Sequence, residues 1–494
     1  MAGVGFELKK LFSARTVIGN LRAYSYTAAI TAGPFALLTG MVLGVQVLFH
    51  LYGVDTGESA NIFTAAIVYA FIFSQILTAG FTMVITRYVT DCIFVHHYRD
   101  VSSSLWGMSA ILVVIGSIAG LLFYWGKPLE LLTRVLGYLC FIQLLPAWLG
   151  TIYLTAVKRY KTLLIGYLSG VVLAVGMAAM LLGLGWLLPE QSGLLAMNLG
   201  IFLMDLAFFL QITQYFGLPR DGEMFAFLPY FEKHGRLFLF SFFYMAGLFT
   251  PNILIWQGSW GVLVGGTYLY APVYDIVTFY AFLSILPTMM LFAVSVETRF
   301  YEAYAVYFHY ILQKGNFRQI DDARRRLLKV LWFELQHIVE YQLVFTLVFL
   351  ALGNYLLSGA GLDYNQVTMY NVLLFGAFFT GLLQVFCVLL LYFDNQQGAM
   401  PVAGCYFGAN LVLGFIGLIW GGPETYGFTF FLASLAAFLL GIHKLSDFSQ
   451  HINSFVYCGQ PVFYQPPQGP LTRLTQWLYG EHYVNLDRTG RGDL

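Results

Sequence analysis

Two aspartates stand inside long apolar stretches of this 494-residue chain, where an ionised side chain is costly. Asp205 lies in a stretch over residues 193–217, and Asp275 in one over residues 268–296. An ionised aspartate at the centre of a membrane helix costs on the order of 3 kcal/mol, so each carboxyl is expected to face the protein interior or water. Two roles are open for such a carboxyl. It contacts a cation, a proton or a substrate, or it forms a hydrogen bond that joins two helices. We favour a functional role for Asp275, because tyrosines surround it at positions 268, 270, 274 and 280.

A third acidic candidate follows two other polar residues at helical spacing. Glu334, His337 and Glu340 recur every three residues and therefore share one face of a helix. A hydrated rim at the membrane surface explains the three without a proton relay. Glu340 lies deepest in its apolar stretch and is retained as a contact in a substrate pathway.

Aromatic residues make up 18% of the chain, and several gather near Asp275. Aromatic faces stack on the C–H faces of sugar rings, while tyrosine hydroxyls bond sugar hydroxyls. Tyr244, Trp256 and Tyr274 are the candidates for such stacking. The alternative is an aromatic belt at the membrane surface, which accounts for many tyrosines and tryptophans in membrane proteins.

No pattern in the sequence indicates a catalytic centre. A glycine-rich phosphate loop, an HExxH zinc motif and a serine nucleophile elbow are all absent. The five cysteines show no metal-binding spacing. We therefore expect a transporter rather than an enzyme, without a cofactor or metal.

The elements that position these residues are membrane-spanning helices. Hydrophobic residues form 59% of the chain and charged residues only 10%, far from the composition of a soluble domain. Runs of about 20 apolar residues predict an all-α integral membrane protein with about 12 transmembrane helices. The expected spans are 24–52, 61–86, 105–125, 132–157, 162–187, 193–217, 236–258, 268–296, 331–357, 367–393, 400–421 and 426–443.

Basic residues fix the expected orientation. Of the 25 lysines and arginines, only Lys127 and Arg134 fall on one side of the predicted membrane. Basic residues concentrate on the cytoplasmic side of membrane proteins. Both termini are therefore expected in the cytoplasm. The connection after the tenth span is the weakest point of this topology, because it carries Asp394 and no basic residue.

Prolines and a short motif indicate two six-helix halves. Pro34 interrupts the first span and Pro251 the seventh, and each is expected to act as a hinge by bending its helix. The second span ends in Thr86-Arg87-Tyr88 and the eighth in Thr298-Arg299-Phe300. Such a parallel repeat predicts a cleft between the halves that opens alternately to either side.

The predicted organisation has five parts. An amphipathic interfacial helix covers 1–23, an N-terminal six-helix bundle 24–217, a cytoplasmic linker 218–235, a C-terminal six-helix bundle 236–443 and a cytoplasmic tail 444–494. The second bundle carries a cytoplasmic insertion at 297–330. Its basic run Arg324, Arg325 and Arg326 anchors the orientation and is also a candidate surface for partner docking.

The chain resembles a known family of transporters in two segments. These are the opening Met1-Ala2-Gly3-Val4-Gly5-Phe6-Glu7-Leu8-Lys9-Lys10, with Tyr24 and Gly33-Pro34 after it, and the stretch Thr298-Arg299-Phe300-Tyr301-Glu302-Ala303-Tyr304. Together with the twelve-span layout, they resemble the inner-membrane transporters of the Pel exopolysaccharide system. These belong to the polysaccharide-transporter branch of the multidrug/oligosaccharidyl-lipid/polysaccharide (MOP) flippase superfamily. The resemblance extends to about residue 445, and the rest of the tail matches no motif.

The resemblance implies a multi-pass protein of the bacterial inner membrane. It would export a partly deacetylated amino-sugar polymer, used in biofilm formation, from cytoplasm to periplasm. The implied partners are a cytoplasmic glycosyltransferase (PelF-like), a cyclic-di-GMP receptor (PelD-like) and a tetratricopeptide-repeat membrane protein (PelE-like), with no role for nucleic acid. The alternatives are a proton-coupled antiporter, a flippase for a lipid-linked sugar or small molecule, or a scaffold that only anchors a synthase.

Overall fold

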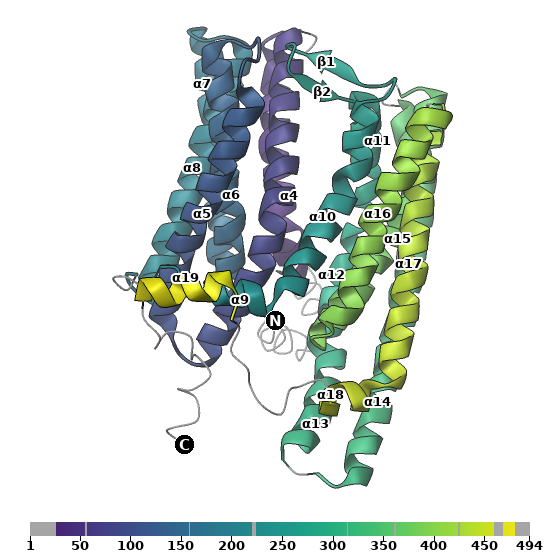
Figure 1. The fold of residues 1–494 in the computed structure, drawn as a ribbon. Coiled ribbons are helices and arrows are strands. Elements are labelled where there is room, and N and C mark those ends of the chain that lie inside the picture. The colour runs from purple at the N-terminus through teal and green to yellow at the C-terminus, as the bar shows by residue number, and fades with distance from the viewer. Residues whose placement is uncertain are drawn as a thin grey trace. The chain divides into compact units, whose positions relative to one another are not determined.

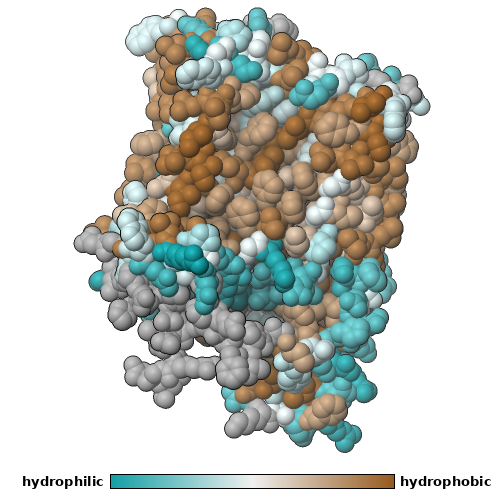
Figure 2. Space-filling model, in the orientation of Figure 1, coloured by the Kyte–Doolittle hydropathy of each residue, from teal (hydrophilic) through white to brown (hydrophobic). Residues whose placement is uncertain are grey.

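The computed structural model describes most of the chain as membrane-length helices (Figure 1). The described residues are 26–54, 57–157, 159–219, 224–313, 315–359, 362–422, 425–458 and 468–479. The amphipathic helix predicted at 1–23 lies outside these ranges. Within them, 12 helices are long and apolar enough to cross a membrane, which confirms the predicted number of spans. Figure 2 shows apolar side chains along the middle of the helices and hydrophilic ones toward their ends.

The described chain divides into two compact units, of which one holds the first six long helices. This unit comprises the described residues within 35–249, 262–270 and 458–479. Its long helices and the short α9 are α3 (Gly33–Leu51), α4 (Glu58–Phe94), α5 (Tyr98–Tyr124), α6 (Leu131–Ala156), α7 (Tyr160–Leu184), α8 (Pro189–Phe216) and α9 (Leu228–Lys233). The first part of α10 (Gly235–Trp256), a β-hairpin and α19 (Pro470–Tyr479) complete it.

Glycines let two helices of this unit touch backbone to backbone. A methyl group built on Gly170 of α7 would lie 2.8 Å from the carbonyl oxygen of Gly200 on α8. The same addition at Gly200 would lie 2.6 Å from the carbonyl oxygen of Gly170. Small residues at such a crossing bring membrane helices into close van der Waals contact, where burial of apolar surface gives little driving force.

The second unit holds the later helices. It comprises the described residues within 26–34, 250–261 and 271–457. Beyond the last turns of α10, its elements are α11 (Pro272–Leu283), α12 (Leu286–Ser295), a π-helical turn (Val296–Phe300), α13 (Tyr301–Leu312), α14 (Phe317–Gly359), α15 (Tyr364–Tyr392), α16 (Gln396–Trp420), α17 (Tyr426–Gln450) and α18 (Ile452–Cys458). The expected insertion at 297–330 is therefore a helical extension of two spans.

Local sequence signals set several helix ends in this unit. Asp363 and Gln366 form a reciprocal capping box at the start of α15. Asn395 caps α16 by accepting a hydrogen bond from the backbone N–H of Gly398 at 2.8 Å. These caps occupy backbone N–H groups that a helix start otherwise leaves without a partner.

A β-hairpin joins α10 to α11 where an outer connection was predicted. Strand β1 (Val262–Val264) pairs antiparallel with β2 (Tyr268–Tyr270), with Leu263 opposite Leu269. The turn uses Gly265 and Gly266 at φ values of 54° and 59°. Positive φ at both central positions is the requirement of a type I′ hairpin turn, which glycine meets without strain.

Aromatic residues of α4 and α5 hold this hairpin. The Tyr69 hydroxyl donates to the Leu269 carbonyl at 2.6 Å and accepts from the Leu269 N–H at 3.0 Å. Tyr268 is fully buried, and its hydroxyl lies 2.9 Å from that of Tyr124. Burial raises the pKa of Tyr268 above its usual range.

Candidate substrate pathway

A carboxylate held by neutral N–H donors lies at the start of α11. Asn252 Nδ2 donates to Asp275 Oδ1 at 2.7 Å, and Trp256 Nε1 lies 3.2 Å from Oδ1 and 3.0 Å from Oδ2. Asp275 stands in the first turn of α11, where the helix dipole favours negative charge. Among the described residues, no basic side chain forms a salt bridge with it. An ionised Asp275 therefore keeps a net charge that a cationic ligand can match.

The two aromatic candidates beside Asp275 are covered. Trp256 is 1% exposed and Tyr274 is 0% exposed. Stacking on a sugar needs a free ring face, and neither ring offers one in this structure. The contact observed for Trp256 is its hydrogen bond to Asp275, which fixes the carboxylate. The stacking role of both residues stays a prediction.

Two other candidates, Asp205 and Tyr244, belong to the unit of the first six helices. In the second unit, a hydrogen bond joins the candidates Trp256 and Asp275. Tyr244 is half-buried on α10, and its ring stacks on that of Phe240 at a centroid distance of 6.2 Å. Asp205 stands on α8, and its Oδ1 is buried without a hydrogen-bond partner among the described residues.

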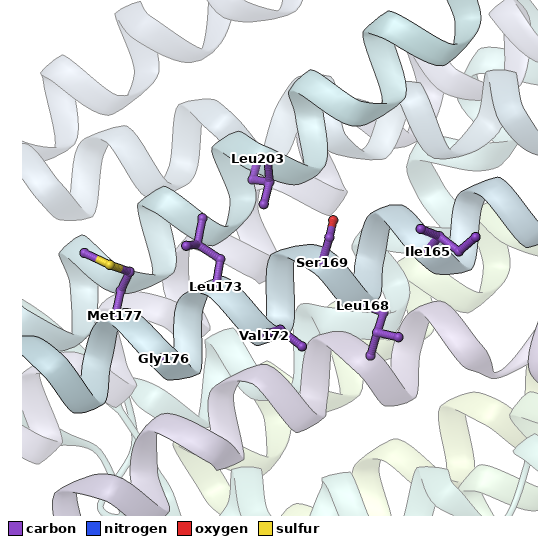
Figure 3. Close-up of a pocket in the computed structure, with 8 residues that line it drawn as sticks. All are labelled: Ile165, Leu168, Ser169, Val172, Leu173, Gly176, Met177 and Leu203. Atoms are coloured by element: carbon purple, nitrogen blue, oxygen red, sulfur yellow. The ribbon is translucent and has the colours of Figure 1, made fainter.

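Close to Asp205 in sequence is an apolar groove between α7 and α8 (Figure 3). Its volume is about 560 Å³, and its walls carry one polar side chain, Ser169. Leu203 of α8 points into it from the helix opposite most of the lining residues. Since Asp205 does not line this groove, the groove adds no polar contact to the pathway.

The acidic residues of α14 divide into an exposed and a buried one. Glu340 has a side chain 51% exposed, and it hydrogen-bonds His337 at 2.9 Å and Gln336 at 2.9 Å on its own helix. Glu334, by contrast, is 8% exposed, accepts from the Ser295 hydroxyl at 2.8 Å and pairs with Arg299 at 3.1 Å. Arg299 stands in the π-helical turn, an irregularity frequent at functional sites.

Two residues in these hydrogen bonds were not selected from the sequence. Asn252 precedes Trp256 by four residues, so the two share a helix face. Glu334 was expected at a hydrated rim, but the structure buries it against Arg299, which lies 35 residues earlier. The spacing of Glu334 from His337 and Glu340 gave no sign of that contact.

Both predicted hinge prolines lie where the chain passes from one unit to the other. The unit boundaries fall between residues 34 and 35 and between 249 and 250, next to Pro34 and Pro251. Pro251 lies inside α10 and has no N–H, so the carbonyl one turn earlier loses its helical partner. The hinge role stays a prediction, supported by this placement.

The predicted docking arginines differ in their contacts. Arg324 and Arg325 both pair with Asp321, at 2.7 Å and 2.9 Å. Arg326 is exposed on α14. The structure thus leaves Arg326 better placed than Arg324 for an outside partner.

The threonine of the Thr-Arg-aromatic motif makes the same hydrogen bond in both units. Thr86 and Thr298 each donate a hydroxyl hydrogen bond to the carbonyl four residues earlier, at 2.7 Å in both cases. Arg87 pairs with Asp91 at 3.4 Å, as Arg299 pairs with Glu334. This likeness supports an internal repeat.

The fold is similar to that of solved MOP-superfamily transporters. The structure of the MATE multidrug transporter DinF-BH shares a TM-score of 0.58 and 14% identity, over 86% of this chain and 95% of that one. An outward-facing multidrug resistance MATE transporter of the MOP superfamily gives 0.54 and 13%, over 87% and 96%. A mutant of the MATE transporter VcmN from Vibrio cholerae gives 0.52 and 12%, over 86% and 98%. The likeness shows that this chain has the multi-pass helical fold of these transporters.

Sequence comparison identifies the family within this class. The sequence model of PelG, described as "Putative exopolysaccharide Exporter (EPS-E)", matches residues 1–457. The chain belongs to the PelG family. A comparison with curated proteins finds no match. The predicted resemblance, fold class and transporter function are thereby confirmed at family level.

Proposed function

We propose that this protein exports the Pel exopolysaccharide, a partly deacetylated amino-sugar polymer, across the bacterial inner membrane from cytoplasm to periplasm. The match to an exopolysaccharide exporter family over residues 1–457 carries the proposal. The expected orientation, with both termini in the cytoplasm, supports the direction of export.

Asp275 is the proposed polymer contact. A deacetylated amino sugar carries an ammonium group at neutral pH, and a carboxylate without a basic partner is its natural acceptor. Asn252 and Trp256 fix the orientation of the Asp275 carboxylate by hydrogen bonds to its two oxygens, and they leave its negative charge in place. Trp256 and Tyr274 then shape the surroundings of this contact, and Tyr244, Asp205 and Glu340 are further substrate contacts in the same proposal.

The test is a substitution that removes the negative charge of Asp275 and keeps the shape of its side chain. We expect Asp275→Asn to lower exported polymer by about tenfold, since a hydrogen bond to a charged group contributes roughly 1.5–3 kcal/mol. Asp275→Glu should retain part of the export. The measurement is secreted polysaccharide per unit of membrane-inserted protein.

A matched control keeps this test specific. Asp447→Asn makes the same chemical change on α17 of the same unit, where the carboxylate is 60% exposed. Its export should equal that of the unmodified protein. Full export by Asp275→Asn would remove this carboxylate from the pathway.

We further propose that the end of α14 docks the cytoplasmic glycosyltransferase, in a complex with the cyclic-di-GMP receptor and the tetratricopeptide-repeat protein. Arg326 is exposed there, while Arg324 and Arg325 pair with Asp321. Arg326→Glu should lower co-purification of the glycosyltransferase, whereas Arg99→Glu, exposed on α5 of the other unit, serves as the control. Equal recovery from both variants would place the docking surface elsewhere.

One observation favours a second function, a proton-coupled antiporter or a flippase for a lipid-linked sugar or small molecule. The Oδ1 atom of Asp205 is buried and has no hydrogen-bond partner among the described residues. A carboxyl in such a place is suited to binding and releasing a proton. Solute flux into vesicles driven by a pH gradient, and abolished by Asp205→Asn, would favour this function over polymer export.

A further inference from the structure

Helix α19 lies across the ends of the long helices in its own unit (Figure 1). It falls beyond residue 457, where the match to the PelG family ends. Its attachment is specific. The Glu232 carboxylate of α9 accepts the N–H of Gly469 at 3.0 Å and the N–H of Thr472 at 3.3 Å, together with the Leu471 N–H and the Thr472 hydroxyl. A carboxylate on the free N–H groups of a helix start is a strong cap.

The same helix is attached at its other end. The Tyr479 hydroxyl accepts a hydrogen bond from the backbone N–H of Phe225 at 3.1 Å. Contacts at both ends fix which face of α19 turns inward. Glu232 and Phe225 therefore set the rotation of the helix as well as its position.

The face that α19 turns inward is its polar one. Thr472 is 1% exposed and Thr475 is 0% exposed, whereas Leu474 and Leu478 are each 42% exposed and Trp477 is 80% exposed. A helix packed on a water-soluble surface shows the opposite pattern. Apolar side chains turned outward beside membrane-spanning helices are stable only in contact with lipid or another apolar surface. Tryptophan is also enriched at the level of lipid head groups.

An apolar cavity of about 760 Å³ lies next to the leucines of α19. Its walls come from α4, α5, α9, α10 and α19, and include Phe81, Ile111, Phe231, Phe238, Leu239 and Leu474. Leu239 on α10 is 38% exposed, so the cavity has an open rim between α10 and α19. All these elements belong to one unit.

Positive charge stands beside the rim. Arg236 lies between the cavity-lining residues Gly235 and Leu239 on α10, and Arg473 adjoins Leu474 on α19. Both arginines are exposed. Basic side chains at this depth attract anionic lipid head groups.

We propose that this cavity binds one acyl chain of an anionic phospholipid, with its phosphate held by Arg236 and Arg473. Glu232 acts at a distance from the lipid by holding α19 in the orientation that closes one wall. The site is a property of this chain's C-terminal segment, and it does not depend on which polymer the protein carries.

Photolabelling tests the proposal on the full-length protein in nanodiscs of phosphatidylcholine. The probe is a trace of phosphatidylglycerol with a diazirine near the end of one acyl chain. Peptides that contain Phe81, Ile111 or Leu474 should be labelled several-fold more than those of the α7–α8 groove in Figure 3, which serves as an internal control for annular lipid. Unlabelled phosphatidylglycerol should compete for the cavity, and added phosphatidylcholine should not.

Variants distinguish the binding of the lipid head group from the role of α19 as a wall of the cavity. The double change Arg236→Gln and Arg473→Gln should make phosphatidylglycerol and phosphatidylcholine probes label the cavity equally, while Arg318→Gln in the other unit should not. Glu232→Ala should reduce labelling of the cavity and leave the α7–α8 groove unchanged. Equal labelling of both surfaces by both probes in the unmodified protein would show only annular lipid and overturn the proposal. A protein segment crosslinked at Leu474 in place of lipid, when the export complex is isolated, would overturn it as well.

Discussion

At the scale of single residues, burial separates acids that look alike in the sequence. Glu334 and Glu340 lie six positions apart on α14, yet one is buried against Arg299 and Ser295 and the other is half exposed. Removing one partner of a buried, hydrogen-bonded charge leaves the other groups uncompensated. The two residues therefore make a matched pair for mutagenesis.

We expect Glu334→Ala to destabilise the protein by roughly 1–3 kcal/mol, because the Ser295 hydroxyl and the Arg299 guanidinium lose their acceptor. The loss of stability should lie near the lower end of this range, because the Arg299 side chain is 68% exposed and water screens its charge. Glu340→Ala should leave the stability nearly unchanged, because its side chain is half exposed and its hydrogen-bond partners lie on its own helix. The midpoint of thermal unfolding in detergent measures both. A larger loss for Glu340→Ala would contradict the assignment.

The candidate site was predictable at this scale only in part. Asp275 and Trp256 could be chosen from residue type, because an acid and an indole in an apolar stretch need a reason to be there. Their contact with Asn252 depends on how α10 and α11 meet, which no local pattern contains. The burial of Tyr274 is equally a result of packing, since a tyrosine near a membrane surface fits a belt, a pathway or a core.

At the scale of elements, the β-hairpin is the feature that the sequence analysis did not predict. Hydropathy predicts where helices enter and leave a membrane, and it has no signal for a strand of three residues. Gly265-Gly266 between Val264 and Thr267 was the available sign of a type I′ turn. The twelve spans themselves were predictable, because backbone groups in lipid must be satisfied within the helix.

Tyr69 is the residue on which we expect the hairpin to depend. Tyr69→Phe removes both hydrogen bonds to Leu269 and keeps the ring that packs at 5.2 Å from Tyr268. Amide hydrogen exchange at residues 262–270 should become faster by about tenfold, the equivalent of roughly 1.4 kcal/mol.

The control for this prediction is Tyr52→Phe. It removes one exposed hydroxyl contact, to the Ala179 carbonyl at 3.3 Å, and should leave exchange in the hairpin unchanged. Unchanged exchange in Tyr69→Phe would show that ring packing alone holds the strands.

At the scale of the whole molecule, orientation in the membrane is the property that most affects function, and it can be measured with a native cysteine. Cys458 is exposed, while Cys92, Cys140 and Cys387 are buried. If the C-terminal segment is cytoplasmic, a membrane-impermeant maleimide should label Cys458 only after the inner membrane is made permeable. In the same cells, Lys127→Cys should be labelled without that treatment, because the distribution of charge predicts that it lies on the opposite side. Labelling of Cys458 in intact cells would reverse the topology and the proposed direction of export.

Helix α14 has 43 residues, a length of about 65 Å at 1.5 Å per residue. The hydrocarbon core of a bilayer is only about 30 Å thick, and the predicted span covers residues 331–357, so residues 317–330 project beyond it by about 21 Å. A continuous helix is stiff and carries motion from one end to the other. A tilt of about 5° within the membrane would move the projecting end through about 2 Å. A protein bound at that end would thus be displaced whenever the transporter tilts this helix. The surface that the two proteins share would keep its structure.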